Sequence, residues 1–348
     1  MIESKIKTID SKEDFDKDYS NDDAIKIYDD SEVFNNISKC INNIIMLSKK
    51  YPNLEIRICN NVFSDESSFN KLITIKNELL KTELKDSNKI KIELPGMGIH
   101  NNFRFYNQKE FETRPTIHTM KEVFETEKVI NQIVEDIKKY NFTPFEMTLA
   151  SYIIVTQFKD YKETKSVSAQ SRSIYSIMFN DYIVCEGYSR LLNNILSKLG
   201  IPSSEIIFNS NYGGHAISLI DLEDDKYGVY GKYLYDPTLD NHNKGKNNLN
   251  DGISPVKYFA MSYFEFENKY RGILVKDLYF LNNGEELLPA LDEEDDLRYE
   301  VNIDSINKES LKECYLEVYS KIFNTDMRKD TKFNESMDEI FNNKNISK

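Results

Sequence analysis

The sequence predicts an α+β protein: a helical layer packed on an antiparallel sheet, with an α/β unit before it and a helical tail after it. Three observations carry this prediction. Short strand-like runs alternate with helix-like segments over the first part of the chain. Apolar residues then recur at helical spacing in the central part. Beyond Gly200, runs of β-branched and aromatic residues predict strands joined by tight turns.

The N-terminal part of the chain predicts a small α/β unit over residues 23–118. Residues 1–22 are polar and rich in charge, so we expect a flexible leader there. The expected strands are rich in isoleucine, and Pro52 and Pro95 end two of the segments. Strands are predicted at 24–30, 54–59 and 89–94, and helices at 32–50 and 66–83.

The central part, residues 119–290, predicts the helix-on-sheet core. A first helix is expected over about 119–139. A second helix begins at Thr143, because Thr143 and Glu146 have the spacing of a capping box and Pro144 suits the first helical position. The core is expected to be α+β, with a helical layer packed against an antiparallel sheet.

The C-terminal part, residues 291–348, predicts an acidic linker followed by a helical tail. The run of acidic residues at 292–296 is typical of a solvated surface segment. Beyond it, one apolar stripe at helical spacing predicts a helix. The residues of that stripe are Leu311, Tyr315, Val318 and Ile322.

Composition and charge exclude several classes of protein. The 348 residues carry a formal charge of −13, which argues against a general basic surface for nucleic acid. No apolar run approaches the roughly 20 residues of a membrane-spanning helix, and the N-terminus lacks a signal-peptide pattern. The four cysteines are scattered, as is typical of a reducing compartment, so we expect a cytoplasmic protein. No nucleotide-binding or calcium-loop motif occurs, and we expect no cofactor or metal.

One cysteine, Cys185, is placed to act as a nucleophile. The residues after it carry apolar side chains at spacings of three and four, which predicts a buried amphipathic helix that ends at Gly200. Cys185 therefore stands at the N-terminus of that helix, where free backbone N–H groups and the helix dipole stabilise an anion. A thiolate is the attacking species in cysteine chemistry, and the same N–H groups can face an oxyanion.

A histidine and an aspartate lie on the two strands predicted after this helix. The midpoint between His215 and Asp236 falls in the turn Glu223–Asp225, so a regular hairpin places the two residues directly opposite each other. Their Cβ atoms would then be roughly 4.5–5.5 Å apart. A carboxylate at that distance can hold the imidazole through one ring nitrogen while the other faces the cysteine. Bulges at Gly228 or Gly231 would shift this register.

The three blocks VCEGYSRLL, GGHAISLI and YLYDPTLD resemble the signature blocks of bacterial transglutaminase-like enzymes, a papain-related superfamily of cysteine enzymes. In that superfamily a cysteine heads a helix, a histidine opens a strand, and an aspartate followed by Pro-Thr closes the neighbouring strand. The matching residues here are Cys185, His215 and Asp236, and the resemblance covers about residues 140–245. It implies a transglutaminase-like (papain-like) core and a Cys-His-Asp triad. Many relatives have a tryptophan after the histidine, whereas this chain contains none and has Ile217 nearby.

The resemblance implies a cysteine-dependent acyl-transfer enzyme that attacks a peptide or protein amide and forms a thioester acyl-enzyme. Water or an amine can resolve that intermediate, and the sequence does not fix which. We favour hydrolysis, because animal cross-linking relatives shield the acyl-enzyme with tryptophan. Protein-glutamine transglutaminase (cross-linking) activity and a catalytically silent protein-interaction module are the alternatives. A peptide or protein substrate is the expected partner, and the sequence gives no information on the oligomeric state.

Other residues are candidates for the cleft. The family implies an upstream polar side chain that assists the oxyanion hole, for which Tyr175 and Gln170 are both candidates. Gly214, before the histidine, would let a substrate backbone approach closely. A zinc site that adds His242 to the three residues is disfavoured. Core positions are expected for Cys40, Cys59 and Cys314, and surface or loop positions for His100, His118 and His242.

Overall fold

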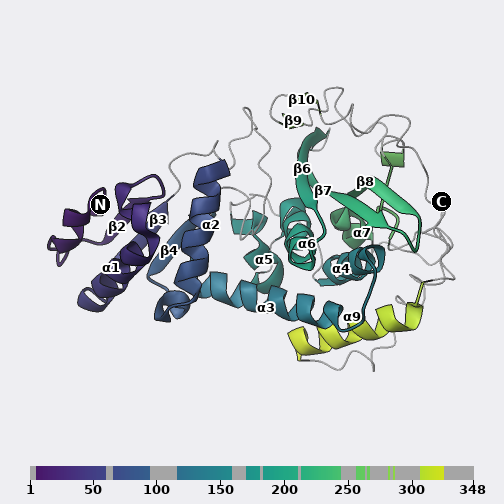
Figure 1. The fold of residues 1–348 in the computed structure, drawn as a ribbon, viewed down its shortest axis with the longest axis horizontal. Coiled ribbons are helices and arrows are strands. Elements are labelled where there is room, and N and C mark those ends of the chain that lie inside the picture. Colours follow the sequence, from purple (N-terminus) through teal and green to yellow (C-terminus); the bar gives the residue numbers. More distant parts are fainter. Residues whose placement is uncertain are drawn as a thin grey trace. The chain divides into compact units, whose positions relative to one another are not determined.

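The structure, a computed structural model, has a mixed α+β fold (Figure 1). It describes residues 5–59, 66–94, 116–158, 170–180, 183–210, 213–243, 256–262, 265–266, 281–282, 285–286 and 306–324. The chain divides into two compact units, Met1–Lys128 and Val129–Lys348. The division falls within helix α3 (Met120–Lys138), because Met120 packs in the core of the first unit and Ile130 in that of the second.

The first unit is built on a five-stranded sheet in the order β1-β2-β3-β4-β5. The first four strands run parallel, and β5 pairs antiparallel with β4. The isoleucine-rich strands are buried, as their composition predicts. The strands are β1 (Ile6–Thr8), β2 (Ala24–Tyr28), β3 (Glu55–Cys59), β4 (Ile90–Leu94) and β5 (Thr116–Thr119). The helices are η1 (Lys12–Asp16), η2 (Glu32–Asn36), α1 (Ile37–Lys50), α2 (Glu66–Leu80) and η3 (Glu83–Asp86).

Residues 5–22 belong to this unit, so the prediction of a flexible leader was wrong for them. Strand β1 extends the sheet beside β2, and two apolar residues after it anchor the segment: Ile9 is fully buried and Tyr19 nearly so. The Tyr19 hydroxyl donates a hydrogen bond to the carbonyl oxygen of Asp14 at 2.6 Å. A few apolar contacts and one added strand thus order a segment whose composition is otherwise that of a solvated chain.

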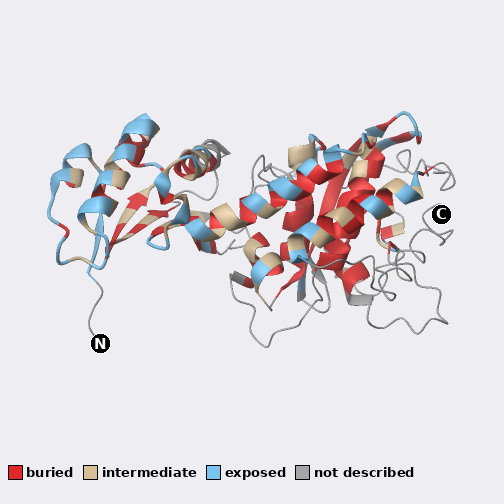
Figure 2. Ribbon diagram, turned by 90° about the horizontal axis from the view of Figure 1, so that it is seen from below, coloured by how far each residue is buried: buried red, intermediate tan, exposed pale blue. Residues whose placement is uncertain are grey.

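The second unit contains an antiparallel sheet, β6-β7-β8, with helices packed against it. Figure 2 shows its buried residues concentrated in the centre and its exposed residues on the outer helix faces. Helix α4 begins at the expected capping box, in which the Glu146 carboxylate accepts from the Thr143 N–H at 2.9 Å. The helices are α4 (Pro144–Phe158), η4 (Gln170–Arg172), α5 (Ile174–Phe179), α6 (Cys185–Leu199), α7 (Pro237–Asn243) and α9 (Lys308–Phe323). The strands are β6 (Ser203–Ser210), β7 (Gly213–Asp224), β8 (Val229–Tyr235), β9 (Leu281–Asn282) and β10 (Glu285–Glu286).

Helix α9 is part of the second unit's core, which corrects the expectation of a helical tail. Its apolar stripe contributes Leu311, Tyr315 and Val318 to the same core that contains α4 and α6. The predicted acidic linker, 292–296, lies outside the described residues. A helix with a sufficiently apolar stripe docks on the core although the rest of its surface is polar.

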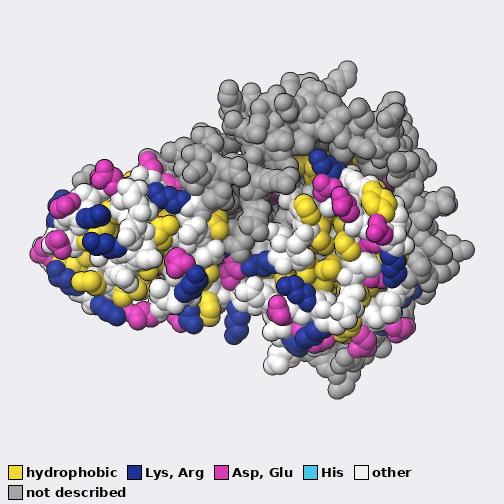
Figure 3. Space-filling view, in the orientation of Figure 1, with side chains coloured by type: hydrophobic (Ala, Val, Ile, Leu, Met, Phe, Trp, Pro, Cys, Tyr) yellow, Lys and Arg dark blue, Asp and Glu magenta, His cyan; other side chains and the backbone are white. Residues whose placement is uncertain are grey.

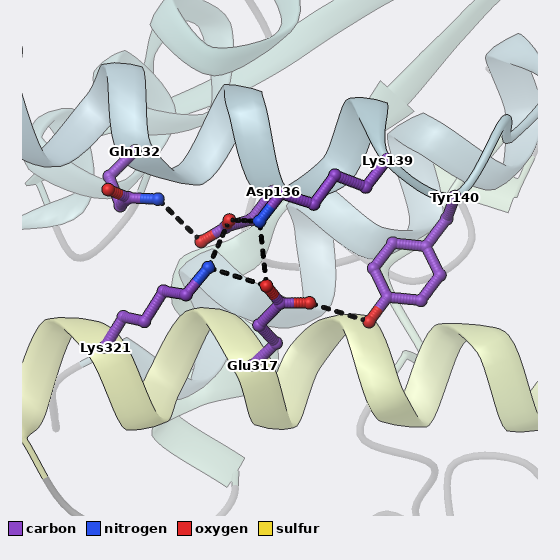
Figure 4. Close-up of polar contacts among 6 residues, drawn as sticks. All are labelled: Gln132, Asp136, Lys139, Tyr140, Glu317 and Lys321. Carbon is purple, nitrogen blue, oxygen red and sulfur yellow. Dashed lines mark hydrogen bonds and ion pairs between the residues drawn. The ribbon is translucent and has the colours of Figure 1, made fainter.

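Polar contacts reinforce the docking of α9 beside α3 (Figure 4). The buried Asp136 carboxylate pairs with Lys139 at 2.5 Å and with Lys321 of α9 at 2.6 Å. Glu317 of α9 pairs with both lysines and accepts a hydrogen bond from the Tyr140 hydroxyl at 3.0 Å. Two positive and two negative groups therefore compensate one another across the two helices.

The surface carries charges of both signs. On the face shown in Figure 3, basic and acidic side chains are interspersed over the described part of the molecule. Among the described residues, no helix has both the length and the apolar character needed to cross a membrane.

Asp136→Asn should lower the free energy of unfolding by about 1–3 kcal/mol, because it removes the buried negative charge with which Lys139 and Lys321 form ion pairs. Chemical denaturation of the full chain measures this. Glu135→Gln is a matched control on the same helix: the Glu135 side chain is 69% exposed and its ion pair with Lys138 spans 3.9 Å. The control should leave the unfolding free energy nearly unchanged. Equal effects of the two substitutions would contradict a specific role for Asp136 in docking α9.

Candidate active site

Cys185 is the first residue of helix α6, as the sequence predicts. The preceding residue, Val184, has an extended backbone (φ −117°, ψ 173°) and is the N-cap of the helix. At the other end Gly200 adopts the left-handed conformation (φ 86°), and its N–H closes the last turn on Leu196. The Cys185 residue is 9% exposed, so its thiol lies near the surface of the core.

Helix α6 is joined to strand β7 close to His215. The Ser189 hydroxyl, one helical turn after Cys185, donates to the carbonyl oxygen of Ala216 at 3.0 Å. The Ser218 hydroxyl donates in return to the carbonyl oxygen of Ser189 at 3.4 Å. Since Ala216 directly follows His215, these bonds bring the cysteine end of α6 to the beginning of β7.

Asp236 follows β8 and caps helix α7. Its Oδ1 accepts hydrogen bonds from the backbone N–H groups of Thr238 and Leu239, each at 3.0 Å. Pro237 occupies the first helical position, where its missing N–H costs nothing. This role was not predicted from the sequence, although Asp-Pro before a polar turn is a recognisable helix start. The cap uses only Oδ1, so the other carboxylate oxygen of Asp236 can bind a second group.

That second oxygen, Asp236 Oδ2, lies 2.6 Å from Nε2 of His215. The pairing is confirmed, but the register predicted for it was wrong. Ser218 stands opposite Tyr235, so the hairpin midpoint lies between residues 226 and 227 instead of between 225 and 226. Continued past β8, this register sets Asp236 opposite Ile217. The two partners are thus diagonal neighbours on one face, a spacing that an imidazole can bridge.

Both Asp236 and Cys185 act on the His215 imidazole. Burial by itself lowers the pKa of His215, but the Asp236 carboxylate and the bonds to Asp236 and Cys185 outweigh it and raise the pKa well above 6.5. With Nε2 facing Asp236, Nδ1 is the ring nitrogen left to face the sulfur. The imidazolium form is therefore favoured next to the thiol.

The side chains of His215 and Asp236 differ in exposure. The Asp236 side chain is fully buried, whereas the His215 side chain is 17% exposed. A carboxylate shielded from water interacts more strongly with its imidazole partner than an exposed one does. The carboxylate is therefore the more deeply buried member of the pair, and the imidazole is the more exposed one.

A buried polar network that the sequence analysis missed fixes helix α7. The Tyr152 hydroxyl of α4 donates to the carbonyl oxygen of Asp236 at 2.9 Å. Asp240 accepts backbone hydrogen bonds from residues 257 and 258, at 3.1 and 3.0 Å. The Tyr188 hydroxyl of α6 donates to Asn241 Oδ1 at 3.1 Å. Helix α6, which carries Cys185, and helix α7, which Asp236 caps, are therefore linked directly.

The other cleft candidates lie on η4, α5 and β7. Gln170 opens η4, whose next residue, Ser171, accepts a backbone bond from Val184 at 3.3 Å. Tyr175 lies on α5 with its ring 4.8 Å from that of Phe179. Gly214 is exposed and pairs with residue 209 of β6. The choice between Gln170 and Tyr175 as oxyanion donor stays a prediction.

The remaining cysteines are buried, as expected. Burial raises the pKa of Cys40, Cys59 and Cys314 to about 12 in each case, so these thiols are held neutral. His118 was expected at the surface, but it is buried on β5 with its Nδ1 3.7 Å from Glu122. His100 lies outside the described residues, and His242 is on α7.

Comparison with known proteins does not add to this geometry. No protein-family model matches the chain, and no curated protein matches it. Within the described part of the chain, no group of three or more His, Cys, Asp or Glu residues is arranged to hold a metal ion. The chemistry of the site therefore rests on its contacts and on the three sequence blocks.

Asp236→Asn should reduce the pH dependence that His215 gives to folding. Folding raises the pKa of His215 above its usual value of 6.5. At a pH just above 6.5 the folded protein therefore keeps a proton on His215 that the unfolded chain has released. The stabilisation is complete below about pH 6.5 and is lost as the pH rises through the raised pKa. Denaturant midpoints measured across this range should fall with pH in the wild type and change less in Asp236→Asn.

Asp225→Asn is the control for this series. It removes a carboxylate of the β7–β8 turn that contacts the exposed Tyr230 at 2.6 Å. Its pH slope should match that of the wild type. An Asp236→Asn slope equal to the wild-type slope would contradict the ion pair as the cause of the raised pKa.

Proposed function

We propose that the protein is a cysteine-dependent acyl-transfer enzyme that uses Cys185, His215 and Asp236 as a triad. One observation carries this proposal: His215 is hydrogen-bonded to the buried Asp236 carboxylate at 2.6 Å, and Cys185 is close enough to join Asp236 in raising the pKa of the imidazole. This is the nucleophile, base and orienting-group arrangement of covalent acyl transfer. The resemblance of the three blocks to transglutaminase-like enzymes supports the same reading of the fold, in which α6 packs against the antiparallel sheet.

The acylation step follows from these contacts. The Cys185 thiolate attacks the carbonyl carbon of an amide, a C–S bond forms, and the carbonyl electron pair moves onto oxygen. The His215 imidazolium, held by Asp236, donates its proton to the amine nitrogen. The C–N bond then breaks, the oxygen pair re-forms the carbonyl, and a thioester is left on Cys185. Asp236 stays ionised throughout and keeps the ring oriented.

Resolution of the thioester reverses these roles. Neutral His215 takes a proton from water as the water oxygen attacks the thioester carbon. The C–S bond breaks, the carboxylic acid product leaves, and the thiolate–imidazolium pair is restored. An amine in place of water would give transfer and a new amide. We propose hydrolysis of a peptide or protein amide, because the chain contains no tryptophan to shield the acyl-enzyme.

Cys185 should react with iodoacetamide near neutral pH much faster than the other three thiols. Cys185 lies at the start of α6 beside His215, whose imidazolium form is favoured, whereas burial raises the pKa of Cys40, Cys59 and Cys314 to about 12. Peptide mapping by mass spectrometry measures the rate at each site. Cys185→Ala should abolish the fast reaction, and Cys314→Ala is the matched control that should keep it. Equal reactivity of the four thiols would favour a catalytically silent interaction module.

The acceptor can be assigned by incubating glutamine-containing peptides with the enzyme and a labelled primary amine. We expect release of free acid or shortened peptide without label, and no reaction with Cys185→Ala. The chemical reason is that water reaches a thioester that no tryptophan covers. Incorporation of the labelled amine at glutamine would contradict hydrolysis and identify a cross-linking enzyme.

A further inference from the structure

A second buried carboxylate, that of Asp240, lies one helical turn after Asp236 in α7. The residue is only 1% exposed, and it accepts hydrogen bonds from two other parts of the chain. Its Oδ1 accepts from the backbone N–H of Lys257 at 3.1 Å. Its Oδ2 accepts from the backbone N–H of Tyr258 at 3.0 Å and from the Tyr152 hydroxyl of α4 at 2.5 Å. These donors satisfy a charge that burial would otherwise make costly.

The two N–H groups belong to the segment 256–261, which is also bonded to the main chain around Asp236. The Asp236 N–H donates to the carbonyl oxygen of Tyr258 at 3.0 Å. Further along the segment, Met261 pairs with Leu234 of β8 through two backbone bonds, of 2.8 and 2.9 Å. The segment is therefore attached to the end of β8, to the aspartate itself and to the helix that follows it.

One residue of the segment has an unfavourable backbone conformation. Ala260 is buried and has a φ of 49°, in the left-handed region that favours glycine. Such a conformation persists only where the surrounding contacts determine it. The bonds at Tyr258 and Met261, on either side of Ala260, are contacts of this kind. The segment is therefore held in one conformation by its bonds to β8 and α7.

Both backbone groups of Asp236 are bound through this arrangement. Its N–H is held by Tyr258, and its carbonyl oxygen lies 2.9 Å from the Tyr152 hydroxyl. That hydroxyl has a single proton, which the Asp236 carbonyl oxygen shares with Asp240 Oδ2. Asp240 thus binds both of the groups that hold the main chain of Asp236. A main chain fixed at both groups limits where Oδ2 of Asp236 can lie relative to His215.

We propose that Asp240 is a positioning residue for the triad. By binding the segment 256–261 and the Tyr152 hydroxyl, Asp240 fixes the main chain of Asp236. The Asp236 carboxylate is thereby kept in place against His215. This inference deepens the proposed function and rests on it. Asp240 acts through these contacts and is not itself a member of the proton relay.

The pKa of His215 in the folded protein reports this positioning, because the Asp236 carboxylate favours the imidazolium only while it stays beside the ring. NMR titration of the histidine ring protons measures that pKa. The chain has four histidines, so the signal of His215 is assigned by its loss in His215→Gln. A Cys185→Ala background removes the effect of the thiol. A residue that only stabilised the fold would change the denaturation midpoint and leave this pKa unchanged.

Asp240→Asn should lower the pKa of His215 by about 1 or more. Both carboxylate oxygens of Asp240 face a backbone N–H, so the amide nitrogen of an asparagine would meet a donor at either position. Tyr152→Phe should lower the pKa in the same direction and by less, because the segment 256–261 then keeps its bonds to Asp240. In an Asp236→Asn background, Tyr152→Phe should cause no further fall.

Tyr227→Phe is the matched control. It also removes a buried tyrosine hydroxyl that is bonded to a carboxylate, that of Glu146 at 2.7 Å, but in the turn between β7 and β8. It should leave the pKa of His215 at its wild-type value. If Asp240→Asn does not fold, Tyr152→Phe and this control still decide the question.

The outcomes distinguish this inference from the proposed function. A lower pKa of His215 in the folded Asp240→Asn and Tyr152→Phe variants, but not in Tyr227→Phe, supports the inference. An unchanged pKa in either folded variant, an equal fall in Tyr227→Phe, or a further fall in the Asp236→Asn background would overturn it while the triad stands. A wild-type Cys185 that iodoacetamide alkylates no faster than the other thiols would overturn the proposed function and this inference with it.

Discussion

The arrangement of the site depends on one carboxylate that serves two elements at once. Asp236 caps α7 with one oxygen and holds His215 with the other, so the helix start and the imidazole fix each other's position. Such a buried carboxylate is stable only while both sets of donors are present. The Tyr152 and Tyr188 hydroxyls extend the same support to α4 and α6. The contacts that position Asp236 therefore also position the helix that carries Cys185.

Much of the fold follows from local patterns in the sequence. The capping box at Thr143 and the left-handed Gly200 set the boundaries of two helices where the sequence predicts them. Isoleucine-rich runs give the buried strands of the first unit. In the site, the helix-start position of Cys185 and the pairing of His215 with Asp236 are likewise foreseeable, because each needs only one helix or one hairpin.

Three features were not predicted, and two of them depend on contacts between residues distant in sequence. The polar segment containing Tyr19 is ordered by strand pairing and burial that its composition does not reveal. The hairpin register differs from the expected one because the turn is centred one residue later, which local composition does not determine. Arg190 is buried by Glu205, fifteen positions away, although an arginine on a helix normally predicts a solvated face. Longer-range packing decides the order of the Tyr19 segment and the burial of Arg190, whereas the register depends on the position of the turn.

The central claim is that Cys185, His215 and Asp236 act as one unit, and a double-mutant cycle tests it most directly. The rate of Cys185 alkylation would be measured at one pH for the wild type, His215→Ala, Asp236→Ala and the double variant. Groups that act through one another give strongly non-additive effects. We predict that Asp236→Ala slows the reaction in the wild type but has little further effect once His215 is absent. Additive losses would contradict the account, because Asp236 would then act independently of His215.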